Sequence, residues 1–448
     1  MAEIAASVSL AASQVVPRGS LRASFSWTFF GNAVYSACQW GILILLAKLG
    51  SPELVGQYAL GLAIVMPIIS LSCLQLRQVI ASDVREEYDF REYVGFRILT
   101  TALALLLIVA VSMLLRYDAL TTWLILLIGF AQGVEALSDV FYARLQSLDR
   151  MDRIARSQIA RGLLSLLALV VGLLLTGSVA WGIVGMILAS TAVMFLHDLR
   201  PQVHSLPPRD IARPRVIWPE QLRPRFLLRQ VGRLLAVVLP LGVVALLVNL
   251  STNVPRYFIE HSLGRSELGI FSAVAFLMSA GNLVASALSQ FAFVRMAGQF
   301  AAGHLREFRH LLLRLLGVGT VLGVGGIVIA HFAGSQLLTL LYRPEYARQP
   351  RLLVGLMVVA WLGYLCQFLG SAMTAARYFR MQVPLFAVIV LVIATSSFWL
   401  IPRHGLPGAV LSLLLGRLVQ LTGSVAILLF SMRRRQVALA AEAAGAAV

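Results

Sequence analysis

The stretch LGSPELVGQY at residues 49–58 returns later in the chain as LGRSELGIF at residues 263–271. With one gap, Leu-Gly, Glu-Leu, Gly and an aromatic residue coincide in the two copies. Each copy follows the first long apolar segment of its half of the chain and opens the second. A weaker pair is Arg-Met at 150–151 and 380–381. This repeat predicts two halves of similar structure that cross a membrane in the same direction.

The sequence around the repeat is strongly apolar. Of its 448 residues 59% are hydrophobic and 13% are charged, whereas soluble domains are about a quarter charged. A bilayer core of about 30 Å takes about 20 apolar residues as a helix. The twelve predicted spans are 25–47, 55–76, 96–115, 121–143, 160–176, 179–197, 234–255, 268–293, 311–332, 352–374, 383–401 and 407–431. The predicted fold is therefore an all-α polytopic membrane protein with two six-helix lobes.

The basic residues indicate how the chain is oriented. Of the 37 Lys and Arg residues, 28 fall in the two termini and the loops on their side, and 8 fall on the other side. Cytoplasmic loops collect Lys and Arg, so we expect both termini in the cytoplasm. For the same reason the net charge of +17 is not taken as a sign of a nucleic-acid partner.

The longest polar segment, 198–233, contains six Pro and eight Arg and is predicted to be a cytoplasmic linker between the lobes. Its last part, FLLRQVGRLL, is typical of an amphipathic helix on anionic lipid headgroups. The predicted division is a tail at 1–24, an N-lobe at 25–197, this linker, a C-lobe at 234–431 and a tail at 432–448.

Signatures of cofactor sites are missing or stand in the wrong context. The chain has no phosphate-binding Gly loop of the Walker type, and GVGTVLGVGG at 317–326 lies inside a span, where it favours close helix contact. His197 and Asp198 are adjacent and lack metal-ligand spacing. The three Cys residues all fall in apolar spans. We therefore expect no cofactor, no metal and no disulfide framework.

Two carboxylates lie well inside the fourth predicted span. Glu135 and Asp139 are four residues apart and share one helix face, which Gln132 extends. Such groups are costly in lipid, so they should face a cavity or a partner. Two carboxylates so close should not both ionise freely, which favours a bound proton or cation. They are the candidate coupling residues; the alternative is a packing stripe that neighbouring helices satisfy.

Three further spans carry polar residues at intervals of three or four, so each stripe faces one way. Together the stripes predict a hydrated passage between the halves. Side-chain amides also form hydrogen bonds between neighbouring helices in membranes. For each single Asn or Gln, such a helix contact is the alternative to a position in the cavity. With Gln132, the predicted cavity amides are Asn32, Gln39, Asn249, Asn253 and Gln367.

Arginines stand at or inside several span ends, namely Arg77, Arg97, Arg256, Arg295, Arg377 and Arg417. Arg binds phosphate through two parallel hydrogen bonds, so a group of them could hold an anionic headgroup. The alternative is that each extends to the membrane surface. Arg417 lies near the middle of its span and needs a buried partner or a ligand.

Several segments carry a resemblance to a known family. LPLGVVALLVNLSTNVPRYFIEHSLGRSELGIFSA at 239–273 is similar to the start of the second lobe of bacterial lipid-linked oligosaccharide flippases. These belong to the multidrug/oligosaccharidyl-lipid/polysaccharide exporter superfamily. LQLRQVIASDVREEYDF at 74–90, LGSPELVGQYAL and LLYRPEYA at 340–347 resemble its other recurring segments.

The resemblance implies a transporter and not an enzyme, with two six-helix lobes around a central cavity. It implies that undecaprenyl-diphosphate-linked oligosaccharides move across the bacterial inner membrane, driven by an ion or by the membrane potential. Implied partners are this lipid-linked substrate, membrane lipids and a glycan polymerase or other assembly proteins. Arg77 and Arg256 fall in resembling segments and Arg417 does not; with Arg377 they are the candidate diphosphate ligands.

Other functions remain open at this stage. A drug or small-solute antiporter of the same superfamily would use Glu135 and Asp139 for cation exchange. A membrane sugar polymerase or glycosyltransferase generally needs a sizeable outer loop with catalytic groups, whereas every predicted outer loop is short. A scaffold for other assembly enzymes would not depend on the polar residues within the membrane.

Overall fold

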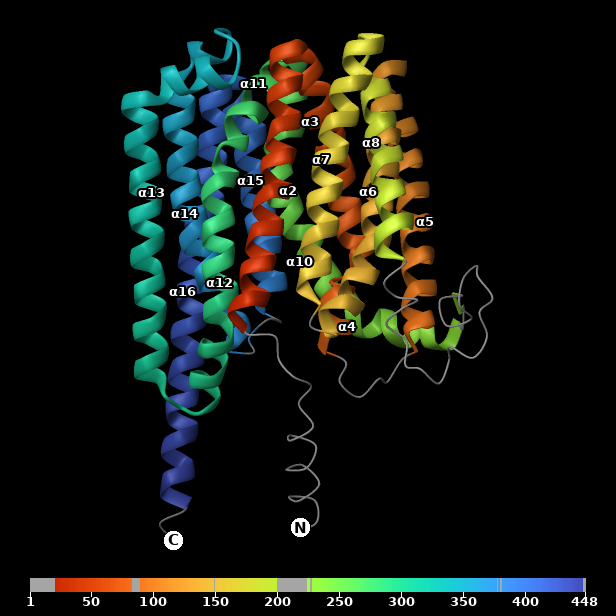
Figure 1. The fold of residues 1–448 in the computed structure, drawn as a ribbon. Coiled ribbons are helices and arrows are strands. Elements are labelled where there is room, and N and C mark those ends of the chain that lie inside the picture. Colours follow the sequence, from red (N-terminus) through yellow and green to blue (C-terminus); the bar gives the residue numbers. More distant parts are fainter. Residues whose placement is uncertain are drawn as a thin grey trace, which may run out of the picture.

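A computed structural model of the chain describes residues 21–82, 89–148, 150–199, 224–225, 228–376, 378 and 381–445. Within these residues all regular structure is helical, and twelve helices are long and apolar enough to cross a membrane. The predicted all-α polytopic class and its twelve spans are thus confirmed. In Figure 1 the helices stand side by side in a single bundle. The predicted N-terminal tail and most of the predicted linker lie outside the described residues.

The first half of the chain forms a group of helices that pack mainly on one another. Here α2 packs on α7 and α7 on α8, while α3, α5 and α8 pack on α6. The short helix α4 also lies against α6. The elements are α2 (Leu21–Leu49), α3 (Pro52–Cys73), α4 (Leu76–Ser82), α5 (Phe90–Leu115), α6 (Ala119–Ser147), α7 (Met151–Thr176), α8 (Val179–Val193) and the π-helix η1 (Met194–Asp198).

The second half forms a corresponding group. Its helix α14 packs on α12, α13 and α16, and α15 packs on α10 and α16. The halves meet chiefly where α3 lies against α10 and α11. The elements are α10 (Leu228–Leu263), α11 (Arg265–Phe276), α12 (Met278–Ala301), α13 (Leu305–Leu341), the 3-10 turn η4 (Tyr346–Arg348), α14 (Pro350–Ala375), α15 (Gln382–His404) and α16 (Leu406–Gly445).

The helix boundaries follow from local sequence. The Ser51 hydroxyl caps α3 by accepting a hydrogen bond from the Leu54 amide, and Pro52 occupies the first turn, where its missing N–H costs nothing. In the second copy of the repeat, Gly264 has a φ of 88° and separates α10 from α11. Glycine adopts this left-handed conformation without steric cost, so the chain can turn sharply there.

Several helix boundaries differ from those of the predicted segments. The second span is interrupted, because α3 ends at Cys73 and Leu74 and Gln75 have φ values of 49° and 52° before α4 begins. The segment predicted as a C-terminal tail from 432 continues as part of α16 to Gly445. Asp198, placed at the start of the linker, is fully buried at the end of η1.

The end of the predicted linker belongs to α10, which begins at Leu228, ten residues before its membrane span begins at Val238. In Figure 1 this first part of α10 runs across one end of the bundle. That end, where α2 begins and α16 finishes, is called the terminal end below; the other is the opposite end.

The two copies of the repeat cross at the opposite end. A Cβ atom at Gly56 of α3 would lie 1.9 Å from the carbonyl oxygen of Arg265, at the start of α11. A Cβ atom at Gly269 of α11 would lie 1.9 Å from the carbonyl oxygen of Pro52, at the start of α3. These glycines are the equivalent residues of the two repeats, and only glycine permits so close an approach.

Polar contacts hold the halves together around this crossing. Arg265 of α11 pairs with Asp118 before α6, with 2.5 Å between Nη2 and Oδ1. The indole of Trp40 donates to the Tyr342 hydroxyl at 3.3 Å, and Nε of Arg343 donates to the Lys48 carbonyl at 3.0 Å. The halves are therefore closed against each other at the opposite end.

Candidate functional site

A cavity of about 890 Å³ lies between the two halves. The first half contributes residues of α2, α3, α4, α6 and α7, and the second half contributes residues of α10, α14 and α15. The lining extends from the middle of the bundle, at Tyr35 and Asn249, to Gln78 and Gln382 near the terminal end. Because the halves touch at the opposite end, the cavity is closed on that side.

The two walls of the cavity differ in chemistry. All of the charged and aromatic lining residues come from the first half, namely Tyr35, Arg77, Glu135, Asp139, Tyr142 and Arg161. The α10 wall is mostly apolar, with Pro240, Leu241, Val244, Ala245 and Val248. Among these lining residues two arginines and two carboxylates balance each other. The cavity is thus an amphipathic and nearly neutral space.

Asp139 lies between two arginines. Its Oδ1 is 3.3 Å from Nη1 of Arg77, and its Oδ2 is 3.6 Å from Nη2 of Arg97. Nε of Arg77 also donates to the Gln146 side chain at 2.9 Å. Arg97 is only 1% exposed, so it points into the first half rather than toward the membrane surface. Asp139 is therefore held by two guanidinium groups from two different helical elements.

Glu135 has a different environment one helical turn away. The hydroxyl of Tyr35 donates to its Oε1 at 2.6 Å, and the Gln39 amide donates to the Tyr35 hydroxyl at 2.8 Å. Arg161 is near enough to interact with it electrostatically, but within the described residues Glu135 forms no ion pair at contact distance. The two carboxylates are therefore held by separate sets of partners.

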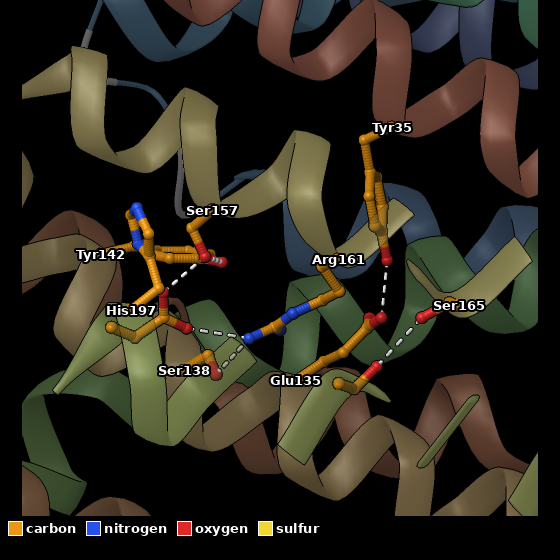
Figure 2. A network of polar contacts seen from close by, with 10 residues as sticks. Tyr35, Glu135, Ser138, Tyr142, Ser157, Arg161, Ser165 and His197 are labelled. Carbon is orange, nitrogen blue, oxygen red and sulfur yellow. Dashed lines mark hydrogen bonds and ion pairs between the residues drawn. The ribbon is translucent and has the colours of Figure 1, made fainter. Parts of the chain in front are cut away.

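A buried polar network surrounds Arg161 (Figure 2). Its Nη2 donates to Ser138 Oγ at 2.6 Å and to Asp198 Oδ2 at 2.9 Å. Arg161 is 3% exposed and Asp198 is fully buried. A buried pair of this kind needs further hydrogen bonds to offset its desolvation, and Asp198 gains one from Ser157.

The local folding of α8 places Asp198 in this network. The helix widens into η1 over its last turn, and such π-turns are found frequently at functional sites. Ser157 in turn contacts the Tyr142 hydroxyl at 2.7 Å, and His197 Nδ1 lies 3.6 Å from Asp198. The network therefore joins α6, α7 and η1 into one wall, from which Arg161 and Tyr142 face the cavity.

The structure brings part of the predicted site together. Arg77, Gln132, Glu135, Asp139 and Asn249 all line the cavity. The predicted residues that do not line it are Asn32, Gln39, Asn253, Gln367, Arg256 and Arg417. Arg377 lies outside the described residues.

Arg256 and Arg417 occupy polar niches within the second half. Arg256 donates to the Asn253 side chain at 2.8 Å, and Arg417 donates to the Gln420 side chain at 2.7 Å. Neither has a carboxylate partner among the described residues. The expectation of a buried partner for Arg417 is met by an amide, three residues along its own helix.

Sequence reasoning missed Arg161 and its partner Asp198. A signal was present, because Ser157, Arg161 and Ser165 recur at four-residue intervals in the fifth span and share one face. Gln158, next to this stripe, also lines the cavity. Arg161 lies near the end of a predicted span, where its charge by itself indicates only the orientation in the membrane.

The fold is that of transporters of the MOP superfamily. The chain matches an inward-facing multidrug resistance MATE family transporter of this superfamily with a TM-score of 0.69 and 11% identity, over 92% of this chain and 98% of that one. An outward-facing MATE family transporter matches with a TM-score of 0.60 and 12% identity, over 92% and 94%. The resemblance to this superfamily, first noted in the sequence, is confirmed.

A relative of known name narrows the comparison. The chain is 25% identical over 406 residues to the capsular polysaccharide biosynthesis protein CapF of Staphylococcus aureus, covering 89% of this chain and 96% of that protein. No family model matches the chain. The chain is thus a multi-pass membrane protein with a transporter fold and a relative in capsular polysaccharide biosynthesis.

Proposed function

We propose that this chain is a flippase, which carries a polyprenyl-diphosphate-linked oligosaccharide across the bacterial inner membrane for polysaccharide assembly. The observation that supports it most is the amphipathic cavity, with a polar wall from the first half and an apolar wall from α10. A lipid-linked sugar has the same division, since its headgroup is polar and its polyprenyl chain is apolar. The relative named for capsular polysaccharide biosynthesis points to the same class of substrate.

Arg77 and Arg161 are the cavity arginines best placed to bind the diphosphate. Each has one terminal guanidinium nitrogen, Nη2 in Arg77 and Nη1 in Arg161, with no hydrogen bond to any described residue. A guanidinium carries five N–H donors, so both can bind phosphate oxygens while they keep their carboxylate partners. Arg256, Arg417 and Arg377 stay as predicted ligands for a state in which the second half faces the headgroup.

Transport would proceed by alternating access of the two halves. The cavity reaches toward the terminal end, which the distribution of basic residues predicts to be cytoplasmic. A lipid-linked sugar would enter there, and the crossing of α3 and α11 would then separate to release it on the other side. The energy source would be a cation or proton at Glu135 and Asp139, the two coupling residues that the sequence predicts, or the membrane potential.

The test is translocation of a fluorescent undecaprenyl-diphosphate oligosaccharide in vesicles containing the purified chain. We expect the Arg77→Gln variant to lose at least about tenfold in rate, because a charge-assisted hydrogen bond contributes about 1.5–3 kcal/mol. Arg295→Gln is the matched control, since Arg295 is exposed and does not line the cavity. Wild-type vesicles that move no lipid-linked sugar would reject the function.

A second experiment concerns the two arginines of the second half. The double variant Arg256→Gln, Arg417→Gln should transport more slowly if the headgroup passes them. Transport at the wild-type rate would remove both from the substrate path and leave the role of Arg77 and Arg161 intact.

The second candidate function is a cation-coupled drug antiporter. It is favoured by Glu135, a cavity carboxylate with no ion pair at contact distance in the described part of the chain, and by the fold shared with multidrug transporters. Growth in the presence of toxic organic cations, with and without the gene, separates the two functions. A drug antiporter would confer resistance that Glu135→Gln abolishes, whereas a flippase would confer none.

A further inference from the structure

Four glutamine side chains line the polar wall of the cavity. They come from three different helices and one break between helices: Gln75 from the α3–α4 break, Gln78 from α4, Gln132 from α6 and Gln158 from α7. All four are partly or fully exposed to the cavity or to solvent. None of their amide groups forms a hydrogen bond with any other described residue, so these four amides are available to a ligand.

This availability sets them apart from the cavity's other polar groups. Arg77 pairs with Asp139, Arg161 pairs with Asp198, and Glu135 accepts from Tyr35. On the facing wall, the Asn249 and Gln382 amides donate to backbone carbonyls of their own half. Each charged group of the lining thus already has at least one protein partner, whereas the four glutamine amides of the first half have none among the described residues.

The backbone at Gln75 adds a separate observation. Leu74 and Gln75 are consecutive non-glycine residues in the left-handed region, which persists only where the surrounding structure imposes it. The break places Leu74 in a buried apolar cluster with Ile80 and Val94, while Gln75 lines the cavity. A continuous helix would have no residues in the left-handed region and would not be strained. The strained backbone lies at the cavity wall, where Gln75 lines the cavity.

The chemistry of an amide identifies the kind of group it binds. Each side-chain amide offers two N–H donors and a carbonyl acceptor, and it carries no charge. A phosphate only accepts hydrogen bonds and is best bound by cations, and a polyprenyl chain forms none. Sugar hydroxyl and acetamido groups both donate and accept, so they match an array of uncharged amides.

We propose that Gln75, Gln78, Gln132 and Gln158 form the glycan-recognition surface of the cavity and set which oligosaccharide is accepted. This inference rests on the proposed function, and it assigns the sugar to the glutamines while the diphosphate belongs to the arginines. A repeat unit rich in hydroxyl or acetamido groups would bind along the wall formed by α4, α6 and α7.

The experiment compares two lipids on the full-length chain in nanodiscs. One is undecaprenyl diphosphate that carries the oligosaccharide extracted from cells lacking this gene, and the other is undecaprenyl diphosphate alone. The test variant is Gln78→Met, Gln132→Met, Gln158→Met, because Met keeps the length of Gln and its helix propensity but has no amide. The matched control is Gln290→Met on α12, an exposed glutamine outside the cavity.

We expect the triple variant to bind the oligosaccharide lipid with an affinity at least about tenfold lower than that of the wild type, and to bind the bare diphosphate lipid with unchanged affinity. The reason is that each lost neutral hydrogen bond lowers the affinity by about threefold to tenfold. Equal losses for both lipids, or no loss for either, would overturn the proposal. Should the triple variant fold poorly, the single variants are compared in the same way, and Gln75→Asn tests the fourth position, since Asn tolerates the left-handed region.

The same measurement separates this inference from the proposed function. If the wild type binds neither lipid, the proposed function fails and the glycan surface fails with it. If the wild type binds both lipids with equal affinity, a flippase remains tenable and only the glycan surface is refuted.

Discussion

The crossing of α3 and α11 makes the strongest quantitative prediction. Replacing Gly56 or Gly269 by Ala adds a Cβ atom 1.9 Å from a backbone carbonyl oxygen of the other helix. Non-bonded heavy atoms are comfortable at about 3.5 Å, so the helices would have to separate by about 1.5 Å. The obstructing atom belongs to the backbone, so no side chain can rotate away to relieve the clash.

The cost falls on one conformation only. Overpacking a tight contact costs about 1–3 kcal/mol. This cost applies when the halves are closed at the opposite end and disappears when they move apart there. A difference of that size changes a two-state equilibrium about 5-fold to 150-fold. Gly56→Ala should therefore shift the population toward the state open at the opposite end.

Spin labels on the two halves measure this shift. Suitable exposed sites at the opposite end are Leu49 and His261, in a background with Cys38, Cys73 and Cys366 replaced by Ala. We expect a short distance in the wild type and a longer distance as the major population in Gly56→Ala and Gly269→Ala.

Gly325→Ala on α13 is the matched control, because no atom lies within 4 Å of the Cβ it would add. A distance distribution in Gly56→Ala that equals that of Gly325→Ala would refute the reasoning, since the crossing would then tolerate the added methyl group.

Two further predictions concern ion pairs. Burial alone would raise the pKa of Asp118, but hydrogen bonds from Thr121 and Arg265 lower it below its ordinary value. Because the pKa is lowered, the ion pair stabilises the closed state above the ordinary carboxyl range, and this stabilisation is lost as the pH falls through the folded-state pKa. The closed population seen by the spin labels should therefore stay constant down to about pH 5 and decline below about pH 4. A transition near neutral pH would contradict this prediction. Arg161→Ala leaves Asp198 buried without its cation and should destabilise the chain by about 3–5 kcal/mol. The double variant Arg161→Ala, Asp198→Ala should recover most of the lost thermal unfolding midpoint, measured in detergent. Equal midpoints for the single and double variants would argue against a coupled pair.

The fold was predictable because its signals are local. Apolar runs near membrane length predicted the twelve spans, and the two copies of one short motif marked where the halves correspond. The motif did not reveal that its glycines meet. Gly56 and Gly269 are far apart in the sequence. Only the packing of α3 on α11 explains why both copies of the repeat have glycine at this position.

The candidate site was predictable only in part, because local spacing defines the face of one helix but not the contacts between helices. The spacing of Gln132, Glu135 and Asp139 fixes their shared helix face, and all three line the cavity. Along α10, however, Asn249 lines the cavity and Asn253 does not. Asn253 stands beside Val254, which packs against α15, so the helix has left the cavity within one turn. The sequence predicts which residues share one face of a helix, but not where along the helix that face passes from the cavity to a neighbouring helix.

The ion pairs were beyond the sequence for another reason. Arg97 and Asp139 are separated by more than forty residues, and no periodicity links them. An arginine at a span end can extend to the membrane surface or point into the protein. Which of these occurs depends on whether a carboxylate lies within its reach in the interior. Arg97 turns inward to Asp139, while Arg295 stays exposed beside Phe291.

The pairing of the cavity arginines bears on how a carrier of a diphosphate could release its cargo. Unpaired arginines in a site shielded from water would hold a diphosphate through several charge-assisted hydrogen bonds, and a substrate held so tightly would leave slowly. In this cavity Arg77 already has Asp139 and Arg161 already has Asp198. Each arginine keeps its carboxylate while the anion is bound, so the carboxylate already neutralises part of the charge that attracts the anion. The gain in free energy on binding is smaller than the number of arginines suggests, which would suit the proposed flippase, because a flippase has to release its substrate on the far side of the membrane. Under the proposed function, discrimination between substrates would then depend on uncharged groups, which on the polar wall are the four glutamines.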